Sequence, residues 1–341
     1  MAGHCDDAKE IQYLDNSAKM EDLDFKYDQN YYPEDSELPD PQRNPLIFGS
    51  KVMLQKVGIA PVDLPVKFVR RDGTTQELHS KVSLYGSLDN VEAKGLNLSR
   101  FYILMHDKVA DRFSIEGLKD VLQDMSVKQG AKNSYCKMRF SYPWTQEALR
   151  TREELPADAP DSEVFKVVDG VKLSHKKKVG HIFYECELEA QLRDGEYKFY
   201  LTVDYMYSST CPCSFELAHD ARLRRKKAAN GHSQRSIAKI KVQFNPDNVV
   251  WIEDVVELAR KYVPTEVVVV CKRRDEQAFA ELNGSNLLFT EDAARLLYQG
   301  LDEWYAAGKI SDFSVVTEHI ESLHPWSAIA VVYKGVEGGL R

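Results

Sequence analysis

The sequence predicts an α+β fold of two modules, in which antiparallel sheets carry helices layered on one face. Three observations support this fold class. Two Arg-Asp-Gly turns, at residues 71–73 and 193–195, each join two strand-like segments. Helix-forming segments with a single apolar face alternate with the strands. The length of 341 residues and the hydrophobic share of 43% are typical of two ordinary globular domains.

Residues 1–45 are rich in Asp, Glu, Asn, Tyr and Pro, a composition that provides no periodic buried face. We expect a polar, acidic N-terminal arm that is disordered or lies on a partner subunit. Antiparallel sheets also leave open edges, and closure into an oligomeric barrel is one way to remove them.

The first module is expected over residues 46–145. Strands are predicted on either side of the first turn, at 66–69 and 78–84. Ser114 is a suitable N-cap for a helix, because apolar residues recur at spacings of three and four from Ile115 onwards.

The acidic, Pro-containing stretch 146–163 is expected to link the modules. The second module, 164–341, repeats the plan of hairpin, helix and strand, which suggests internal duplication. Its expected strands are 179–192, 197–207 and 327–333, and its expected helices are 252–262 and 290–306.

Composition narrows the possible functions. A net charge of −8 argues against nucleic acid or a membrane surface as the partner of the whole protein. No apolar run reaches the roughly 18 residues that span a bilayer. The acidic start of the chain lacks the basic and apolar regions of a secretion signal, so we expect a cytoplasmic protein with reduced thiols.

The richest chemistry lies in the second half. Cys211 and Cys213 follow a predicted strand, and His232 comes after a basic run at 222–227 that we expect in a polar loop, either solvated or reaching a phosphate. A thiolate with an imidazole is a common zinc pair, and an open coordination position would make the site catalytic. A closed structural zinc site completed by Cys213 and Cys271 explains the spacing equally well, and simple packing of the cysteines is a third interpretation.

Acidic residues follow an apolar run at 267–271 that we interpret as a strand. Asp275 and Glu276 would then lie at a strand end, where carboxylates can bind a metal or act as a base. A solvated charge run is the alternative. The Asn-Gly pair at 283–284 is interpreted as a turn.

Glu291 follows Thr290 at a predicted helix start. It is suited either to compensating the helix dipole or to accepting two N–H groups from a guanine edge. Glu321 and His324 are three residues apart and would share one side of a helical turn. Such a pair is structural more often than catalytic.

Taken together, these stretches resemble GTP cyclohydrolase type IB, in order and over most of the chain from about residue 51. The motifs that carry the resemblance are Val57-Gly58-Ile59, Lys94-Gly95-x-x-x-Ser99-Arg100-Phe101, Cys211-Pro212-Cys213-Ser214, His232-x-Gln234-Arg235-Ser236, Arg274-Asp275-Glu276, Asn283-Gly284, Glu291-Asp292-Ala293-Ala294-Arg295 and Glu321-Ser322-x-His324-Pro325.

The resemblance implies two tandem tunnelling-fold modules, a homotetramer with sites at subunit interfaces, and hydrolysis of GTP to 7,8-dihydroneopterin triphosphate and formate. It also implies a divalent metal, zinc or manganese. Cys211, His232 and Glu276 match the metal ligands, and Glu291 matches the carboxylate that anchors guanine. Cys211, His324 and Glu321 match catalytic positions.

Arg235, Arg100 and Lys94 are candidates for binding the triphosphate, because guanidinium forks and ammonium charges suit phosphate oxygens. Three departures from the family pattern stand out. Asn97 and Trp326 occupy positions where the family has histidines, and the interval between Cys211 and His232 is longer. They raise two alternatives, namely a paralogue that opens a different purine or pterin and a non-catalytic purine-binding protein with a structural metal.

Overall fold

The computed structural model describes residues 23–38 and 49–340. The chain divides into two compact units, 1–44 and 45–341. In the first unit, the described part contains a short 3-10 helix, η2 (Asp35–Glu37), and exposed tyrosines such as Tyr27 and Tyr32. Residues 1–22 and 39–48 of the expected arm and its junction lie outside the described residues, so the role of the arm stays a prediction.

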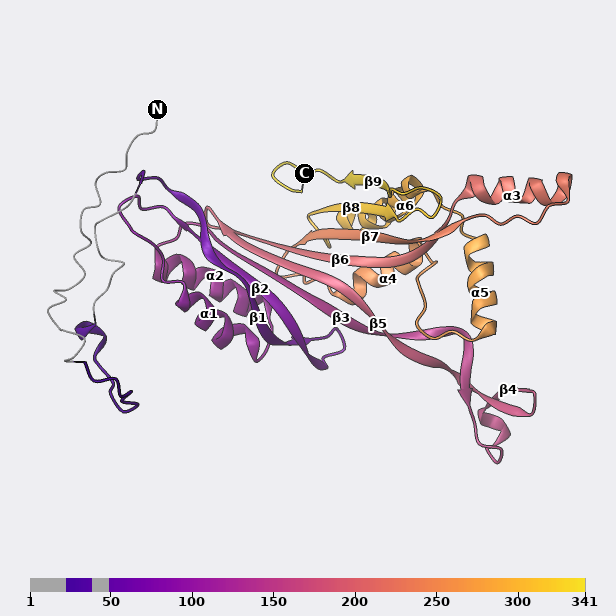
Figure 1. The fold of residues 1–341 in the computed structure, drawn as a ribbon, viewed down its shortest axis with the longest axis horizontal. Helices are drawn as coiled ribbons and strands as arrows, with labels where there is room; N and C mark the ends of the chain where they lie inside the picture. Colours follow the sequence, from indigo (N-terminus) through magenta and orange to yellow (C-terminus); the bar gives the residue numbers. More distant parts are fainter. Residues whose placement is uncertain (1–22, 39–48, 341) are drawn as a thin grey trace. The chain divides into compact units, whose positions relative to one another are not determined.

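The described part of the second unit is built on one antiparallel sheet of nine strands (Figure 1). Strands that neighbour one another in the sheet also follow one another in sequence, except that β4 pairs only with β5. The strands are β1 (Leu54–Val69), β2 (Thr75–Leu88), β3 (Ser134–Glu154), β4 (Val164–Val168), β5 (Val171–Arg193), β6 (Glu196–Thr210), β7 (Ser233–Phe244), β8 (Asp312–His319) and β9 (Ala328–Tyr333).

Helices are inserted between β2 and β3, between β6 and β7, and between β7 and β8, and a short 3-10 helix lies between β3 and β4. None of the helices in the described ranges is long and apolar enough to cross a membrane. The helices are α1 (Ser99–Met105), the π-helix η4 (His106–Ala110), α2 (Ile115–Gln129), the 3-10 helix η5 (Asp161–Glu163), α3 (Pro212–Arg225), α4 (Ile252–Tyr262), α5 (Arg273–Gly284) and α6 (Thr290–Ala306).

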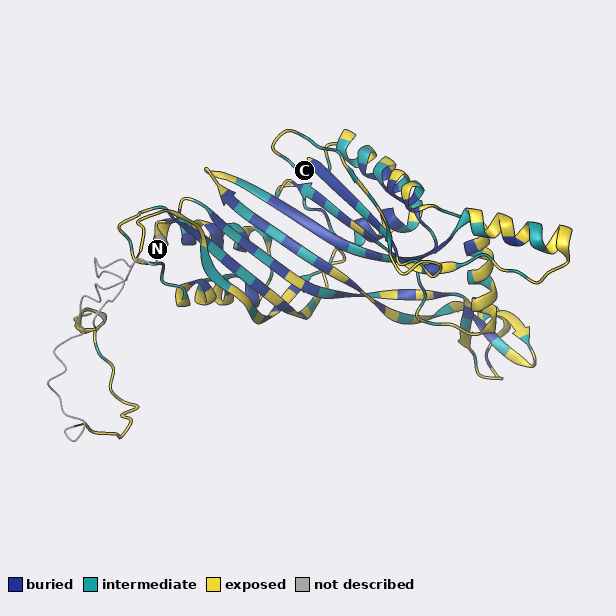
Figure 2. Cartoon of the chain, turned by 45° about the horizontal axis from the view of Figure 1, so that its top comes forward, coloured by how far each residue is buried: buried dark blue, intermediate teal, exposed yellow. Residues whose placement is uncertain are grey.

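The two faces of the sheet differ because side chains alternate along every strand, as the burial colours of Figure 2 show. Phe140, Leu188 and Leu201 are buried on the face that α2 and α4 cover. Their sequence neighbours Arg139 and Glu187 lie on the opposite, charged face. The prediction of an α+β fold with antiparallel strands and helices layered on one face is therefore confirmed.

Both predicted turns connect paired strands. Gly73, with φ of 83°, closes the β1–β2 hairpin, while Asp194 (51°) and Gly195 (85°) close the β5–β6 hairpin. Positive φ at these positions explains the Asp-Gly pair. Arg71 at the first turn reaches α4, where it forms ion pairs with Asp254 at 2.9 Å and with Glu257 at 2.5 Å.

The structure bears out the helices predicted at 252–262 and 290–306, which are α4 and α6. The helix after Ser114 is α2, and the Ser114 hydroxyl accepts a hydrogen bond from the amide of Gly117 at 2.9 Å, as expected of an N-cap. The strands around both turns also form as expected.

The segment 146–163 is only partly irregular, which corrects our interpretation of it as a linker. Residues up to Glu154 continue β3, and Glu147 still pairs with Val179 of β5. Only Pro156 and Pro160 lie beyond this strand end. The division into two modules at this point stays a prediction.

The apolar run at 267–271 is not a strand. Its backbone lies against Gln146, whose Nε2 donates to the Val267 carbonyl at 2.8 Å and whose Oε1 accepts from the Val269 amide at 3.0 Å. A Cβ at Gly180 would stand 2.7 Å from Val269, so the run crosses closely over β5. Gln146 thus supplies two of the hydrogen bonds that a strand partner would give, while the Val267 amide donates to the Met206 carbonyl of β6 at 3.3 Å.

Three further expectations were wrong at the level of local structure. The Asn-Gly pair at 283–284 ends α5 and does not form a turn of its own. Arg222, Arg224 and Arg225 belong to α3, where cations in the last turn favour the helix dipole, and not to a loop. Residues 322–326 form bends and Glu321 lies outside any helix, so Glu321 and His324 share no helical turn.

Helix α2 provides a test of the apolar face. Leu122 is fully buried against the sheet, whereas Val127 on the same helix is 69% exposed. We expect Leu122→Ala to lower the free energy of unfolding by about 2–5 kcal/mol, because it removes buried methyl groups and leaves a cavity. Urea titration measures this, and Val127→Ala should change stability by no more than about 0.5 kcal/mol. Equal losses in both variants would contradict the assigned burial.

Candidate functional site

Strand pairing brings Cys211 and His232 together. The last residue of β6, Thr210, pairs with the first residue of β7, Ser233, so the residues just beyond them face each other across the ladder. The amide of Cys211 donates to the carbonyl of His232 at 3.2 Å. The long insert between the two residues, which contains α3, therefore does not separate them.

His232 is held by polar neighbours from two elements. Its Nδ1 lies 2.9 Å from Oε1 of Gln234 on β7 and 3.4 Å from Oγ of Ser322. The Glu321 carboxylate is 3.8 Å from the same nitrogen, and both side chains are largely buried, with exposures of 20% for His232 and 14% for Glu321. Glu321, predicted beside His324, is therefore placed against His232.

Gln234 is a site residue to which the sequence analysis assigned no role. It is 7% exposed, and its Nε2 donates to Ser209 Oγ at 2.8 Å while its Oε1 contacts His232. Ser209 in turn contacts Ser236 at 2.8 Å. A glutamine at an inward-facing strand position next to a candidate ligand is the signal that could have identified it.

A cavity of about 590 Å³ adjoins this end of the sheet. Glu276 and Cys271 both line it. Hydroxyl groups from the paired strand ends, aromatic and basic groups from α3, and one face of α5 complete the wall. The polar lining residues other than Glu276 and Cys271 are Ser208, Thr210, Ser233, His219, Arg222, Asn230 and Asn283.

The predicted metal ligands are thus distributed over two adjoining places. Cys211 and His232 lie together at the strand ends, and Glu276 lines the cavity. No three His, Cys, Asp or Glu side chains within the described ranges are close enough to form a ligand set. Cys213 and Cys271 are both exposed, and they complete no closed structural zinc site in this part of the chain.

Glu291 is exposed in the first turn of α6, close enough to influence His319 at the end of β8. His319 is 2% exposed, and its Nε2 is 2.9 Å from the Tyr207 hydroxyl. Burial lowers the pKa of His319 to about 4, although the Glu291 carboxylate opposes the shift. His319 is therefore neutral at physiological pH.

The remaining predicted residues are exposed. Arg235 lies on β7 near Cys211 in the ladder, whereas Lys94 and Arg100 lie in or before α1. No contact among the described residues joins Lys94 or Arg100 to the Cys211–His232 pair. His324 stacks on Trp326 with ring centroids 4.6 Å apart and an interplanar angle of 9°.

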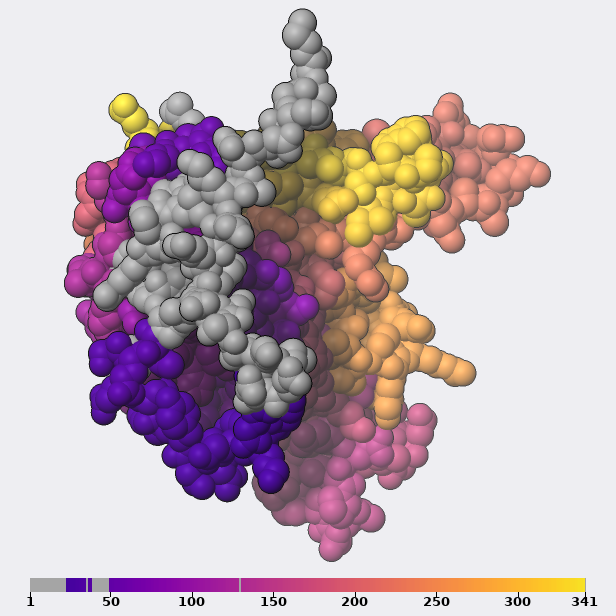
Figure 3. All heavy atoms as spheres, turned by 60° about the vertical axis from the view of Figure 1, so that its left-hand side comes forward, coloured from indigo at the N-terminus to yellow at the C-terminus, as the bar shows by residue number. Residues whose placement is uncertain are grey.

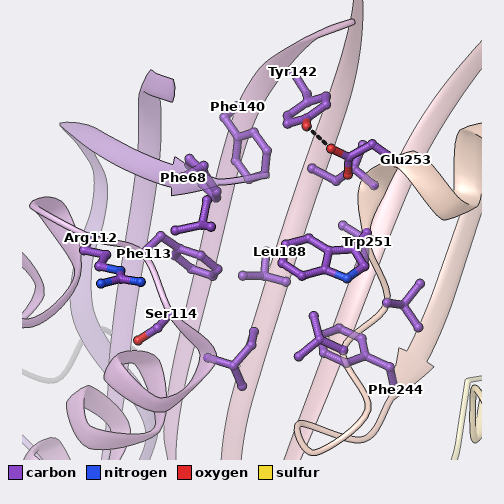
Figure 4. Close-up of a pocket in the computed structure, with 16 residues that line it drawn as sticks. Phe68, Arg112, Phe113, Ser114, Phe140, Tyr142, Leu188, Phe244, Trp251 and Glu253 are labelled. Carbon is purple, nitrogen blue, oxygen red and sulfur yellow. Dashed lines mark hydrogen bonds between the residues drawn. The ribbon is translucent and has the colours of Figure 1, made fainter. Parts of the chain in front are cut away.

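A second cavity, of about 270 Å³, lies between the sheet and the first turns of α2 and α4 (Figure 4). Phe68, Phe140 and Trp251 line it, and the Tyr142 hydroxyl donates to Glu253 at 2.6 Å on its wall. It contains none of the predicted site residues. Cys211, His232 and Glu276 lie instead near the other end of the β6–β7 ladder. Helices α3 and α5, which project from the surface in Figure 3, lie beside this end.

Comparison with known proteins identifies relatives over nearly the whole chain. A family model described as type I GTP cyclohydrolase folE2 matches residues 38–160 and 165–330. GTP cyclohydrolase FolE2 of Cereibacter sphaeroides is 39% identical over 300 residues, covering 87% of this chain and 76% of that protein. The protein of the same name from Ruegeria pomeroyi is 38% identical over 332 residues, covering 96% and 82%.

Among solved structures, the uricase of Arthrobacter globiformis covers 87% of this chain and 97% of its own, with a TM-score of 0.44 and 10% identity. A superposition this loose carries no information on the function of this chain.

His319 predicts a pH dependence of stability. The folded pKa of about 4 lies below the ordinary value of 6.5, so the unfolded chain binds more protons between these values. Stability from neutral His319 is complete above pH 6.5 and is lost as the pH falls toward 4. Between pH 7 and pH 5, urea unfolding of the wild type should lose about 2 kcal/mol more than that of His319→Gln, which cannot titrate. Parallel pH profiles would refute the assignment.

Proposed function

Because the chain belongs to the type I GTP cyclohydrolase FolE2 family, we propose that it converts GTP to 7,8-dihydroneopterin triphosphate and formate at the β6–β7 end of the sheet. It is a GTP cyclohydrolase I type enzyme of folate biosynthesis. The observation that supports this location is the pairing of Cys211 with His232 beside a cavity that Glu276 lines.

A divalent metal fits the donor chemistry of this place. A thiolate, an imidazole and a carboxylate are ligands that zinc accepts, and manganese is the other candidate. We propose that Cys211 and His232 hold the metal and that Glu276 supplies the carboxylate. When bound, such a metal would promote ionisation of the water that attacks C8 of the guanine.

The polar groups around His232 orient it. Gln234 and Ser322 both contact Nδ1, which leaves Nε2 as the nitrogen available for a metal. Glu321, at 3.8 Å, adds a negative charge that favours a cation at this position. Gln234 therefore acts as a positioning group for the imidazole.

Opening of the imidazole ring requires a proton at N9 after water has added to C8. We assign that proton transfer to His324. Its ring is kept in one orientation by stacking on Trp326, the residue that departs from the family pattern.

Substrate recognition is assigned to the exposed charged residues. Glu291 can accept the two N–H groups of the guanine edge, and Arg235 can bind the triphosphate from the β7 end. Lys94 and Arg100 belong to the first half of the chain. We propose that the protein is a cytoplasmic homotetramer in which one subunit contributes Lys94 and Arg100 to the site of another.

The first test is turnover of GTP by purified protein with added manganese or zinc. We expect formate and, after oxidation, fluorescent neopterin. Cys211→Ala should lower kcat/KM by at least about a hundredfold, because it removes a metal ligand.

Cys136→Ala is the matched control, because Cys136 is a buried packing residue and its loss should leave the activity of the folded protein unchanged. Folded, metal-loaded protein that releases no formate from GTP would refute the assigned substrate and favour a different purine or pterin.

Glu291 provides a separate test of base recognition. Glu291→Gln should raise KM for GTP by about tenfold or more, because an amide accepts only through its single oxygen. Inosine triphosphate lacks the 2-amino group, so the substitution should cost less with this substrate. Asp292→Asn removes a charge from the same helical turn and should affect both nucleotides equally. An equal KM increase with both nucleotides in Glu291→Gln would contradict base recognition.

A further inference from the structure

Asp275 is a fully buried carboxylate at the start of α5. Its Oδ1 accepts from the backbone amides of Arg150 at 2.7 Å and of Thr151 at 2.9 Å, both on β3. Its Oδ2 accepts from the amide of Lys272 at 2.9 Å and from the Thr151 hydroxyl. Four donors thus converge on one side chain, and three of them come from β3.

The first turns of α4 and α6 contain aspartates at the same position as Asp275, and comparison with them shows that the contacts of Asp275 are unusual. Asp254 of α4 and Asp292 of α6 also accept from the amide three residues before them, each at 3.3 Å. Their remaining partners are Arg and Lys side chains. Only Asp275, among these three residues, binds the backbone of a strand, so it does more than cap its own helix.

The other polar links between α5 and β3 are weak. Arg150 pairs with Glu281 and Lys272 pairs with Glu154 at 3.1 Å, but all four side chains are 42–56% exposed. Exposed ion pairs contribute roughly 0–1 kcal/mol. A buried carboxylate with charge-assisted hydrogen bonds is stronger and has only one geometry.

We propose that Asp275 is the positioning residue for Glu276, and that it fixes the first turn of α5 on the end of β3 so that the Glu276 carboxylate is held at the wall of the cavity. This inference rests on the proposed function, in which Glu276 is a metal ligand. The part of β3 formed by residues 146–154 then holds the helix that carries Glu276.

The chemistry of Asp275→Asn follows from the donor pattern. Each carboxylate oxygen accepts from two donors. An asparagine has the same shape but places an NH2 group, itself a donor, against two of them. With the amide nitrogen in the place of Oδ2, the Thr151 hydroxyl can turn to accept from it, but the hydrogen bond from the Lys272 amide is lost and two N–H donors face each other, which loosens the first turn of α5 on β3.

The experiment compares the full-length protein with Asp275→Asn, Glu276→Gln and the double variant, each titrated with Co²⁺. The cobalt ligand-field and thiolate charge-transfer bands report coordination without any turnover. We expect Asp275→Asn to weaken Co²⁺ binding by about 10- to 100-fold and to produce the spectrum of Glu276→Gln. In the double variant the second substitution should add no further loss.

Two further variants separate positioning from folding. Arg150→Ala removes the exposed link to α5 but keeps the backbone amide that Asp275 binds, so its cobalt spectrum should match the wild type. Thr151→Val removes one donor and preserves the other three, so a smaller loss of affinity is expected in a folded protein. Circular dichroism and thermal melting verify that each variant is folded.

The outcomes are distinguishable. If Glu276→Gln changes the cobalt spectrum but folded Asp275→Asn and Thr151→Val bind as the wild type does, the positioning role is overturned while the proposed function stands. If Glu276→Gln itself leaves cobalt binding unchanged, the ligand assignment and the inference both fail. Additive losses in the double variant would likewise overturn the coupling between the two residues.

Discussion

The hydrogen-bonded pairing of β3 with β5 is the constraint on which the rest of the structure depends. It runs from Ser134 opposite Leu192 to Glu154 opposite Leu173 and joins the hairpin of the first half to the strands of the second. Because side chains alternate along both strands, this one register decides which residues meet the helices and which remain on the charged face. A slip by one residue would exchange the two faces.

The residues of the candidate site lie at or near the ends of strands. Cys211 and His232 lie just beyond the ends of paired strands, Glu321 follows β8, and Glu276 lies in the first turn of a helix that is docked on β3. Backbone ladders fix such positions more rigidly than loops do, since every amide is already committed to a partner. The geometry of the candidate site therefore follows from the sheet, and side-chain contacts such as that between Gln234 and His232 refine it.

Sequence reasoning was most successful where one element carries its own signal. The helices α4 and α6 were predictable from periodicity. Cys211 and His232 do lie side by side, as a ligand pair must, but their role as ligands stays a prediction. Sequence reasoning failed where long-range contacts decide the outcome. The apolar run 267–271 has strand-like composition, but the Gln146 side chain takes two of its backbone hydrogen bonds and no strand ladder forms. Likewise, the residues around Glu321 give no sign that its carboxylate lies 3.8 Å from His232, and their spacing suggested a helical turn shared with His324 instead.

The two Arg-Asp-Gly turns illustrate the same limit. They suggested equivalent positions in a repeated unit, yet the first joins β1 to β2 and the second joins β5 to β6. If η5, β4 and α3 are left aside, each half has two strands, then helices, then two strands, and the second turn lies between the halves. The Asp-Gly pairs predicted the two hairpins correctly, but which strands each hairpin joins depends on the pairing of the whole sheet.

The insert that contains α3 has an evolutionary consequence. Its two ends are held together by the pairing of Thr210 with Ser233, so the length of the insert does not change how these strand ends pair. Descendants of this gene can lengthen, shorten or recharge α3 without displacing Cys211 from His232. A search pattern that demands a constant interval between that cysteine and that histidine would miss true members of the lineage, whereas one anchored on the flanking strands would retain them.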